Sequence, residues 1–227
     1  MIGIICAMDA EYDAVKKGFD RFREFVHDGF RFAESVSPRM VLARSQVGKT
    51  AAAACVEVMT ALYPMIDLLI STGISGALAP QIPIGSVIIG KTVLEYGEGA
   101  SVRYPLHPIE KLNAGIESFC EQQGIPVFSG TVLSSDAPVF DASCKRQLYQ
   151  EFRAISVEME SAGICAECWK RGIRVSVVKV ISDFAEPCAS RQLRSGFIRA
   201  FDALTELFSN LIKEEWYGKV GCRHSDS

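Results

Sequence analysis

Short apolar runs alternate with longer amphipathic segments along almost the whole chain. Runs such as Ile2–Cys6, 67–72 and 174–181 have the length and composition of buried strands, and the segments between them repeat apolar residues at helical spacing. Strands that alternate with helices in this way build a layered α/β domain with a largely buried sheet. The sequence therefore predicts one such domain, since no repeat, low-complexity tract or linker interrupts the pattern.

The apolar pattern also places the individual elements. Strands are expected at 2–6, 30–35, 39–45, 67–72, 86–92, 127–133, 154–157 and 174–181. Helices are expected at 9–22, 49–63, 109–122 and 158–171. A last helix has apolar residues at spacings of four, three, four and three, namely Phe197, Phe201, Leu204, Phe208 and Leu211. We expect this stripe to face the core.

Composition narrows the class of protein. The chain has 227 residues, 48% of them hydrophobic and 22% charged, and its net charge is −3. These values exclude a disordered chain and a strongly basic nucleic-acid binder. No apolar stretch approaches the roughly 20 residues that cross a membrane, and the N-terminus has no basic leader, so we expect a soluble, unexported protein. The domain is expected at 1–215, followed by a flexible tail at 216–227.

Cysteine usage indicates the compartment. The eight cysteines are scattered through apolar contexts, which is typical of reduced thiols in a cytoplasmic protein. Cys165 and Cys168 form a CxxC within a helical pattern, but there is no second CxxC and there are only three histidines. Because a zinc site needs four convergent ligands, packing is the favoured interpretation, with metal or redox chemistry as the alternative.

Acidic residues follow three of the expected strands. Glu11 comes after the first strand, Glu158 and Glu160 come after AISV, and Asp183 follows the run VSVVKVIS. Ligands of open α/β sheets gather beyond the carboxyl ends of strands, so these acids predict a site for acid/base chemistry. The alternative is that each stabilises a helix N-terminus. Glu158 and Glu160 are two residues apart and would face different ways on a regular helix, which predicts different roles.

Two glycine-containing segments resemble turns that bind anions. The segment 72–77, TGISGA, could bring backbone N–H groups to an anion or a sugar hydroxyl, or could be only a tight turn. The segment 47–50, VGKT, matches only the end of a phosphate-binding loop. Neither has the GxGxxG pattern, so a dinucleotide-binding oxidoreductase is disfavoured.

Six segments in a fixed order carry a resemblance to a known family. They are MIGIICAMDAE, SQVGKTAAA, STGISGALAP, SSDAP, VEMES and VISD. Together they resemble the nucleoside phosphorylase and nucleosidase superfamily over about residues 1–212, and most closely its 5′-methylthioadenosine/S-adenosylhomocysteine nucleosidases. The resemblance implies a single-domain, three-layer α/β/α nucleoside phosphorylase-like fold with a mixed central sheet.

The resemblance also implies roles for individual residues. Glu11 matches the glutamate that activates water, and Asp183 matches the aspartate that protonates purine N7. Glu160 matches the glutamate that binds the ribose hydroxyls. The remaining substrate-binding residues implied are Met8, Ser75, Gly76, Val139, Glu158, Met159 and Ser182. Of these, Met159 would pack under the sugar, Glu158 would support the ribose site, Ser182 would orient Asp183, and main-chain groups near Val139 would contact adenine.

The implied reaction is hydrolysis of the N-glycosidic bond of a purine nucleoside. It needs a general acid for the leaving base, a base for water and negative charge near the ribosyl cation, which three separately tuned carboxyl groups can supply. The family implies no metal and no cofactor. The partner implied is a small nucleoside, with neither nucleic acid nor membrane, and related nucleosidases are usually homodimers.

The chain departs from the family pattern at several positions, which leaves alternatives open. Ser71 stands where phosphorolytic members have a phosphate-holding arginine, and Pro138 stands where nucleosidases often have a stacking phenylalanine, with Phe140 nearby. Ile74 replaces a common serine. The alternatives are a nucleosidase for another modified purine nucleoside such as a futalosine, a phosphorylase, or a nucleoside-binding protein without turnover. Retention of Glu11, Glu160 and Asp183 together argues against the binding protein.

Overall fold

The computed structural model describes residues 1–213 except 36, 38, 98–100, 108, 188 and 189. The expected tail at 216–227 lies outside the described residues.

The described residues form ten strands and six helices. The strands are β1 (Ile2–Cys6), β2 (Phe22–His27), β3 (Phe30–Ser35), β4 (Met40–Arg44), β5 (Leu68–Ala77), β6 (Val87–Glu95), β7 (Arg103–Pro105), β8 (Val127–Ser134), β9 (Ala154–Glu158) and β10 (Arg174–Asp183). The helices are α1 (Asp9–Lys16), α2 (Lys49–Leu62), α3 (Glu110–Gln123), α4 (Ala142–Phe152), α5 (Ser161–Arg171) and α6 (Ser190–Lys213). The strands β2, β3 and β4 follow one another directly in this order of elements, as do β5, β6 and β7.

These strands form one mixed sheet that is partly closed. Its order is β10-β6-β8-β9-β5-β1-β4-β3-β2, with β7 beside β6. Because β10 pairs with β5 as well as with β6, the strands β5, β10, β6, β8 and β9 close on themselves, and β1, β4, β3 and β2 extend from β5 as an open sheet. The ends of β1, β9 and β10 all meet β5 within residues 71–76, since Ile5 pairs with Ser71 and both Val157 and Asp183 pair with Gly76.

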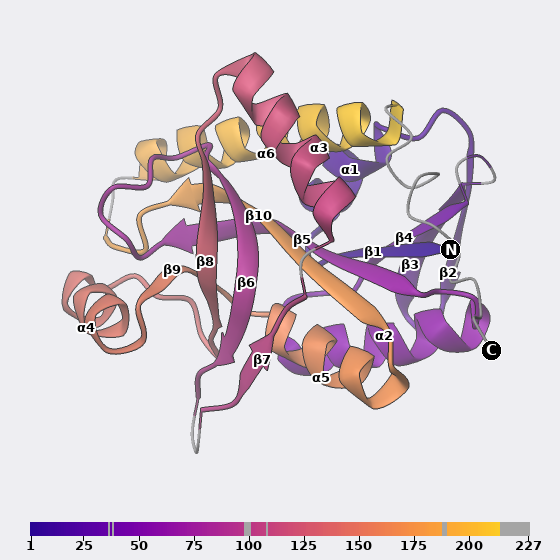
Figure 1. The fold of residues 1–227 in the computed structure, drawn as a ribbon, viewed down its shortest axis with the longest axis horizontal. Helices are drawn as coiled ribbons and strands as arrows, with labels where there is room; N and C mark the ends of the chain where they lie inside the picture. Colours follow the sequence, from indigo (N-terminus) through magenta and orange to yellow (C-terminus); the bar gives the residue numbers. More distant parts are fainter. Residues whose placement is uncertain (36, 38, 98–100, 108, 188–189, 214–227) are drawn as a thin grey trace.

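Helices cover both faces of the sheet, which confirms the expected three-layer α/β architecture. Helices α1, α3 and α6 lie on one face, and α2 and α5 lie on the other (Figure 1). Each face has its own core: Tyr12, Ile116 and Phe208 belong to the first, and Cys55, Met59 and Cys165 to the second. Each helix within the described part of the chain is too short or too polar to span a lipid bilayer.

The structure corrects several expected elements. The helix expected at 9–22 ends at Lys16, and Gly18 then packs tightly against α6, where a Cβ would lie 2.8 Å from Ile212 Cδ1. The glycine-rich segment 72–77 is not a loop, because β10 and β9 pair with it and keep it within β5. The helix expected at 158–171 begins only at Ser161, because Glu158 still belongs to β9.

Three elements were missed by the apolar pattern. β2 is an exposed edge strand with no fully buried side chain, and β7 has only three residues. Helix α4 buries only Lys145 and Leu148, and it is defined instead by its N-cap, where the Asp141 carboxylate accepts the Cys144 N–H at 2.7 Å. All three contribute too little to the core to leave a periodic signal.

Candidate active site

One pocket lies where β1, β9 and β10 end against β5. All ten predicted site residues line it: Met8, Glu11, Ser75, Gly76, Val139, Glu158, Met159, Glu160, Ser182 and Asp183. Eight further residues complete the wall: Ala7, Val47, Ile74, Ser135, Pro138, Phe140, Val157 and Phe197. The pocket therefore combines four carboxyl groups with an apolar wall.

Three backbone N–H groups fix the carboxylate of Glu11, which lies in the short helix α1. Its Oε2 accepts the N–H groups of Ala7 and Met8 at 2.8 and 2.9 Å, and its Oε1 accepts the Ile74 N–H at 2.8 Å. The side chain enters the space above Gly73, where a Cβ would collide with the carboxylate. Burial raises the pKa of Glu11, and Lys179 and the three N–H groups offset only part of that rise. A buried carboxylate with a raised pKa is suited to accept a proton.

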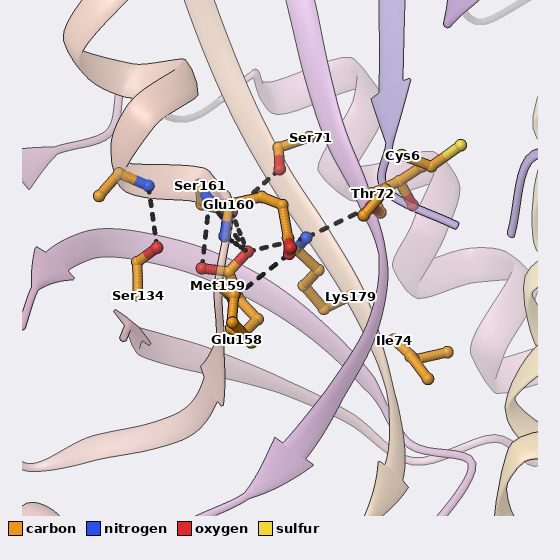
Figure 2. A network of polar contacts seen from close by, with 12 residues as sticks. Cys6, Ser71, Thr72, Ile74, Ser134, Glu158, Met159, Glu160, Ser161 and Lys179 are labelled. Carbon is orange, nitrogen blue, oxygen red and sulfur yellow. Dashed lines mark hydrogen bonds and ion pairs between the residues drawn. The ribbon is translucent and has the colours of Figure 1, made fainter. Parts of the chain in front are cut away.

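Glu158 forms a fully buried ion pair with Lys179. Lys179 Nζ lies 2.9 Å from Glu158 Oε2 and donates to the Thr72 carbonyl at 3.3 Å (Figure 2). Burial alone would raise the pKa of Glu158, but the Lys179 ammonium and the hydrogen bonds to this carboxylate lower it. Burial likewise opposes the charge on Lys179, yet Glu158, Glu160 and Glu11 raise its pKa. Both groups are therefore charged at neutral pH.

Hydrogen bonds from the start of α5 complete this network. Ser161 donates its Oγ–H to Glu158 at 2.8 Å, and the Glu160 N–H donates at 3.2 Å. Behind them, the hydroxyls of Ser71 and Ser161 are 2.9 Å apart (Figure 2). Ser71 is fully buried and does not line the pocket. Ser71, which stands where the family resemblance leads us to expect an arginine in a phosphorylase, thus makes an internal hydrogen bond instead.

Glu160 lies beside Glu158 but has different partners. Its Oε1 accepts the Gly48 N–H at 2.9 Å, and its Oε2 accepts the Met159 N–H at 3.3 Å. Burial, with the neighbouring charge of Glu158, raises the pKa of Glu160 to about 7. The two glutamates line one pocket because Glu158 ends β9 and Glu160 is the N-cap of α5, so regular helix geometry does not separate them.

Asp183 is fixed at the end of β10. Its Oδ2 accepts the Ser182 hydroxyl at 2.7 Å, and its Oδ1 accepts the Ala185 N–H at 2.8 Å. The same Ser182 hydroxyl lies 3.3 Å from the Ser75 carbonyl on β5. The carboxyl group is therefore oriented by its neighbours while its half-buried position leaves it accessible from the pocket.

The apolar wall comes from two segments. Pro138, Val139 and Phe140 precede α4, and Phe197 comes from α6. Phe197 and Phe201 were expected to face the core, but both are only partly buried, and Phe197 lies in the pocket wall. Phe140 is 49% exposed, which leaves its ring available to a ligand.

The pocket offers no cation of its own. None of the residues that line it is Lys, Arg or His. In the part of the chain that the structure describes, no three His, Cys, Asp or Glu side chains are grouped as a metal site. Cys165 and Cys168 are both free thiols buried in α5, and burial raises the pKa of Cys168 to about 12, as expected for packing residues.

Sequence reasoning missed two residues that shape this site. Lys179 was assigned only to a strand, although a lysine within the apolar run VSVVKVIS predicts a buried acidic partner. Gly48 was considered only as part of a phosphate loop, whereas its N–H binds Glu160. No sequence signal links Gly48 to Glu160, because the two are 112 residues apart.

The chain is similar to known proteins both in sequence and in structure. The 5′-methylthioadenosine/S-adenosylhomocysteine nucleosidase of Staphylococcus aureus (strain MRSA252) is 25% identical over 199 residues, which cover 82% of this chain and 87% of the relative. The nucleosidase of the same name from Neisseria meningitidis, solved with methylthio-immucillin-A, has a TM-score of 0.82 at 22% identity, with coverage of 94% and 98%. The native futalosine hydrolase of Helicobacter pylori has the same TM-score and identity, with coverage of 94% and 97%.

These structural likenesses show the fold, and the family follows from the sequence. The family model described as "Phosphorylase superfamily" matches residues 1–214, which is nearly the whole chain. That match includes every residue of the pocket. The chain therefore belongs to the phosphorylase superfamily.

Proposed function

We propose that the protein is a nucleosidase that hydrolyses the N-glycosidic bond of 5′-methylthioadenosine or S-adenosylhomocysteine. One observation carries this proposal: Glu11, a buried carboxylate with a raised pKa, and Asp183, a carboxyl oriented by Ser182, line the same cation-free pocket. The pair supplies one base and one acid. The Staphylococcus aureus relative carries this activity in its name.

In the proposed mechanism, Asp183 donates its proton to N7 of the purine as the bond between C1′ and N9 breaks. The bonding electron pair leaves with the base. A water molecule forms the new bond to C1′ and gives its proton to Glu11. Nearby negative charge stabilises the ribosyl cation that develops between these events. Each proton transfer contributes about 10² to 10⁴-fold to the rate.

The other lining residues bind the substrate in this proposal. Glu160 accepts the ribose hydroxyls, and Met159 packs under the sugar. Glu158, neutralised by Lys179, holds the start of α5 and so supports Glu160. On the base side, the main chain near Val139 contacts the adenine edge, and the ring of Phe140 replaces the stacking aromatic that Pro138 cannot supply. Met8, Ser75 and Gly76 complete the binding surface.

Hydrolysis is favoured over phosphorolysis by the charges of the pocket. A phosphate nucleophile would need a cation or a cluster of donors, and the described lining residues include no cation. Lys179 lies behind Glu158 and is already paired with it. Water, which is neutral, can enter beside four carboxyl groups without such a partner.

A second substrate class is another modified purine nucleoside, such as a futalosine. The exposed position of Phe140 and the proline at 138 favour it. They leave the part of the apolar wall that would contact the base, residues 138–140 (the base wall), less defined than a stacked phenylalanine would. We further propose a cytoplasmic homodimer that acts in methionine salvage. The free buried cysteines support a reducing compartment, and the family resemblance supports the dimer.

Chromatography of a nucleoside panel, with and without phosphate, tests the proposal. We expect free adenine and free thiopentose from methylthioadenosine, at a rate that does not depend on phosphate. A pentose 1-phosphate as the main product would identify a phosphorylase. Binding without any product would identify a nucleoside-binding protein. Faster cleavage of futalosine than of methylthioadenosine would select the second substrate class.

A further inference from the structure

Lys49, the first residue of α2, is a nearly buried cation beside the pocket that the proposed reaction does not use. Its Nζ lies 2.7 Å from Asp136 Oδ1 and 3.2 Å from Glu95 Oε1, and it donates to the Tyr96 carbonyl at 3.3 Å. Its side chain is only 13% exposed. A lysine with these partners is not free to bind a phosphate group, although the segment VGKT resembles part of a phosphate loop.

The backbone next to Lys49 reaches the sugar side of the pocket. Gly48 donates its N–H to Glu160 Oε1, and it adopts a φ of 105° that favours glycine. Helix α5 packs tightly against the backbone of Lys49, since a Cβ on Gly163 would collide with the Lys49 carbonyl. The position of residue 49 therefore sets where the Gly48 N–H meets Glu160.

The side chain of Lys49 reaches the other side of the pocket. Its partner Asp136 immediately follows Ser135, which lines the pocket and donates its N–H to the Glu158 carbonyl at 2.8 Å. The lining residues Pro138, Val139 and Phe140 begin two residues after Asp136. Lys49 thus joins the backbone that holds Glu160 to the segment that forms the base wall.

We infer that Lys49 is a positioning residue, whose ion pairs with Asp136 and Glu95 hold the Gly48 N–H against Glu160 and fix the base wall at the same time. The inference rests on the proposed function, in which Glu160 binds the ribose. Among the described residues Glu160 forms no ion pair within 4 Å, so a displaced Gly48 would leave its Oε1 without the donor that now orients it. Misplacing a positioning group by about 1 Å can cost about 100-fold in rate.

The central variant is Lys49→Met, which keeps the length of the side chain and removes the charge. For methylthioadenosine we expect kcat/KM to fall about 10-fold or more. Lys49→Arg should restore most of the activity, because it can still pair with Asp136. Lys170→Met is the control for loss of a lysine charge: Lys170 pairs with Glu167 at 2.6 Å, neither residue lines the pocket, and the change should leave kcat/KM unchanged.

A binding cycle separates positioning from general loss of structure. A C-nucleoside analogue of methylthioadenosine cannot be hydrolysed, so its Kd can be measured by calorimetry in wild type, Lys49→Met, Glu160→Gln and the double variant. We expect Lys49→Met to weaken binding about 10-fold in the wild-type background and less than about 3-fold beside Glu160→Gln. Equal losses in both backgrounds, or no loss in either, would overturn the inference.

The outcomes also distinguish this inference from the proposed function. If wild type neither binds the analogue nor releases a base from any nucleoside, the proposed function fails and the inference fails with it. If wild type is active and Lys49→Met matches it, only the inference fails. Should Lys49→Met not fold, Asp136→Asn replaces it in the cycle, because that side chain is 59% exposed. A Kd for Asp136→Asn equal to that of wild type would then overturn the inference.

Discussion

At the scale of single residues, the four carboxyl groups of the pocket differ in what balances their charge. Glu158 has the ammonium of Lys179, Glu11 has three N–H groups, and Asp183 has one hydroxyl and one N–H. Glu160 has two N–H groups and a negative neighbour. The pKa of Glu158 is therefore lowered while the pKa values of Glu11 and Glu160 are raised, so these three glutamates of one pocket differ in proton affinity.

Asp183 and Glu11 can be tested by substitutions that keep the shape of the side chain. Asp183→Asn removes the proposed proton donor, and Glu11→Gln removes the proposed base, so each should lower kcat by about 10² to 10⁴-fold. Both variants should still bind the C-nucleoside analogue. If the two acids only stabilise helix ends, steady-state kinetics will show nearly normal turnover, and thermal melts a change of about 0.3 to 1 kcal/mol.

The raised pKa of Glu160 predicts how the stability of the folded protein depends on pH. This pKa is raised from 4.5 to about 7, so the folded protein binds this proton more tightly than the unfolded chain does. The stability that this carboxyl contributes is fully present below pH 4.5 and is lost as the pH rises through about 7. Glu160→Gln cannot ionise, so its melting temperature relative to wild type should be higher at pH 8 than at pH 5.

Glu158→Gln is the matched control for this pH experiment. It should lower the melting temperature at both pH values, because it leaves Lys179 buried without its counter-ion, at a cost of about 3–5 kcal/mol. Circular dichroism melts at the two pH values measure both variants. If the difference in melting temperature between Glu160→Gln and wild type does not change with pH, the assignment of the raised pKa to Glu160 is contradicted.

At the scale of elements, β5 determines where the acids meet. It continues through Gly73, Ser75 and Gly76 to Ala77, while β10 pairs along one side and β9 joins at its end. Glycine is required where the strand passes Glu11, since Gly73 has a φ of 129° and has no room for a Cβ. The glycine-rich segment that resembled an anion-binding loop therefore belongs to a strand, and Gly73 leaves the space that the Glu11 carboxylate occupies.

Gly73→Ala tests this role of β5. The added methyl group must displace Glu11, and the positive φ adds backbone strain of about 1–3 kcal/mol. We therefore expect kcat to fall about as far as in Glu11→Gln, together with a lower melting temperature. Gly124→Ala is the control: its φ is also positive at 64°, but no atom lies within 4 Å of the new Cβ. It should lose stability without losing kcat, and a parallel loss of kcat in this control would contradict the prediction.

Apolar periodicity was sufficient to predict the strands and helices that bury one face, and insufficient to predict those that do not. The strand Ile2–Cys6 and the helix at 49–62 were predicted nearly to the residue, because both contribute several buried side chains. The edge strand β2 and helix α4 contribute few, so they left no period to detect. Within β5, glycine residues were interpreted as a turn, although pairing with two neighbouring strands outweighed their local preference.

At the scale of the whole molecule, strand pairing brings distant acids together. Glu11 and Glu158 are 147 residues apart, and they meet because β1 and β9 both pair with β5. Strand-end acids predicted that a site exists, but the order of strands in a sheet has no local sequence signal. The resemblance to a family supplied the residue set, whereas the Glu158–Lys179 pair and the Gly48–Glu160 contact required the fold.

The charge of the whole molecule predicts which nucleosides the pocket excludes. The chain carries a net charge of −3, and of the four carboxyl groups that line the pocket only Glu158 is paired with a cation among the described residues, Lys179, which lies behind it. A 5′-phosphate would enter against this field, and like charges brought together cost several kcal/mol, where about 1.4 kcal/mol is tenfold. We therefore expect kcat/KM for methylthioadenosine to exceed that for AMP by about 100-fold or more.

Salt dependence tests whether charge causes this selectivity. Adenosine, which is neutral and lacks the 5′-thioether, is the control that separates charge from the loss of apolar contact. Raising the ionic strength should increase kcat/KM for AMP and leave the values for adenosine and methylthioadenosine nearly unchanged, because screening weakens only the repulsion. A kcat/KM for AMP equal to or above that for methylthioadenosine at low salt would show that a cation reaches the 5′-position, and would remove the electrostatic basis for preferring hydrolysis.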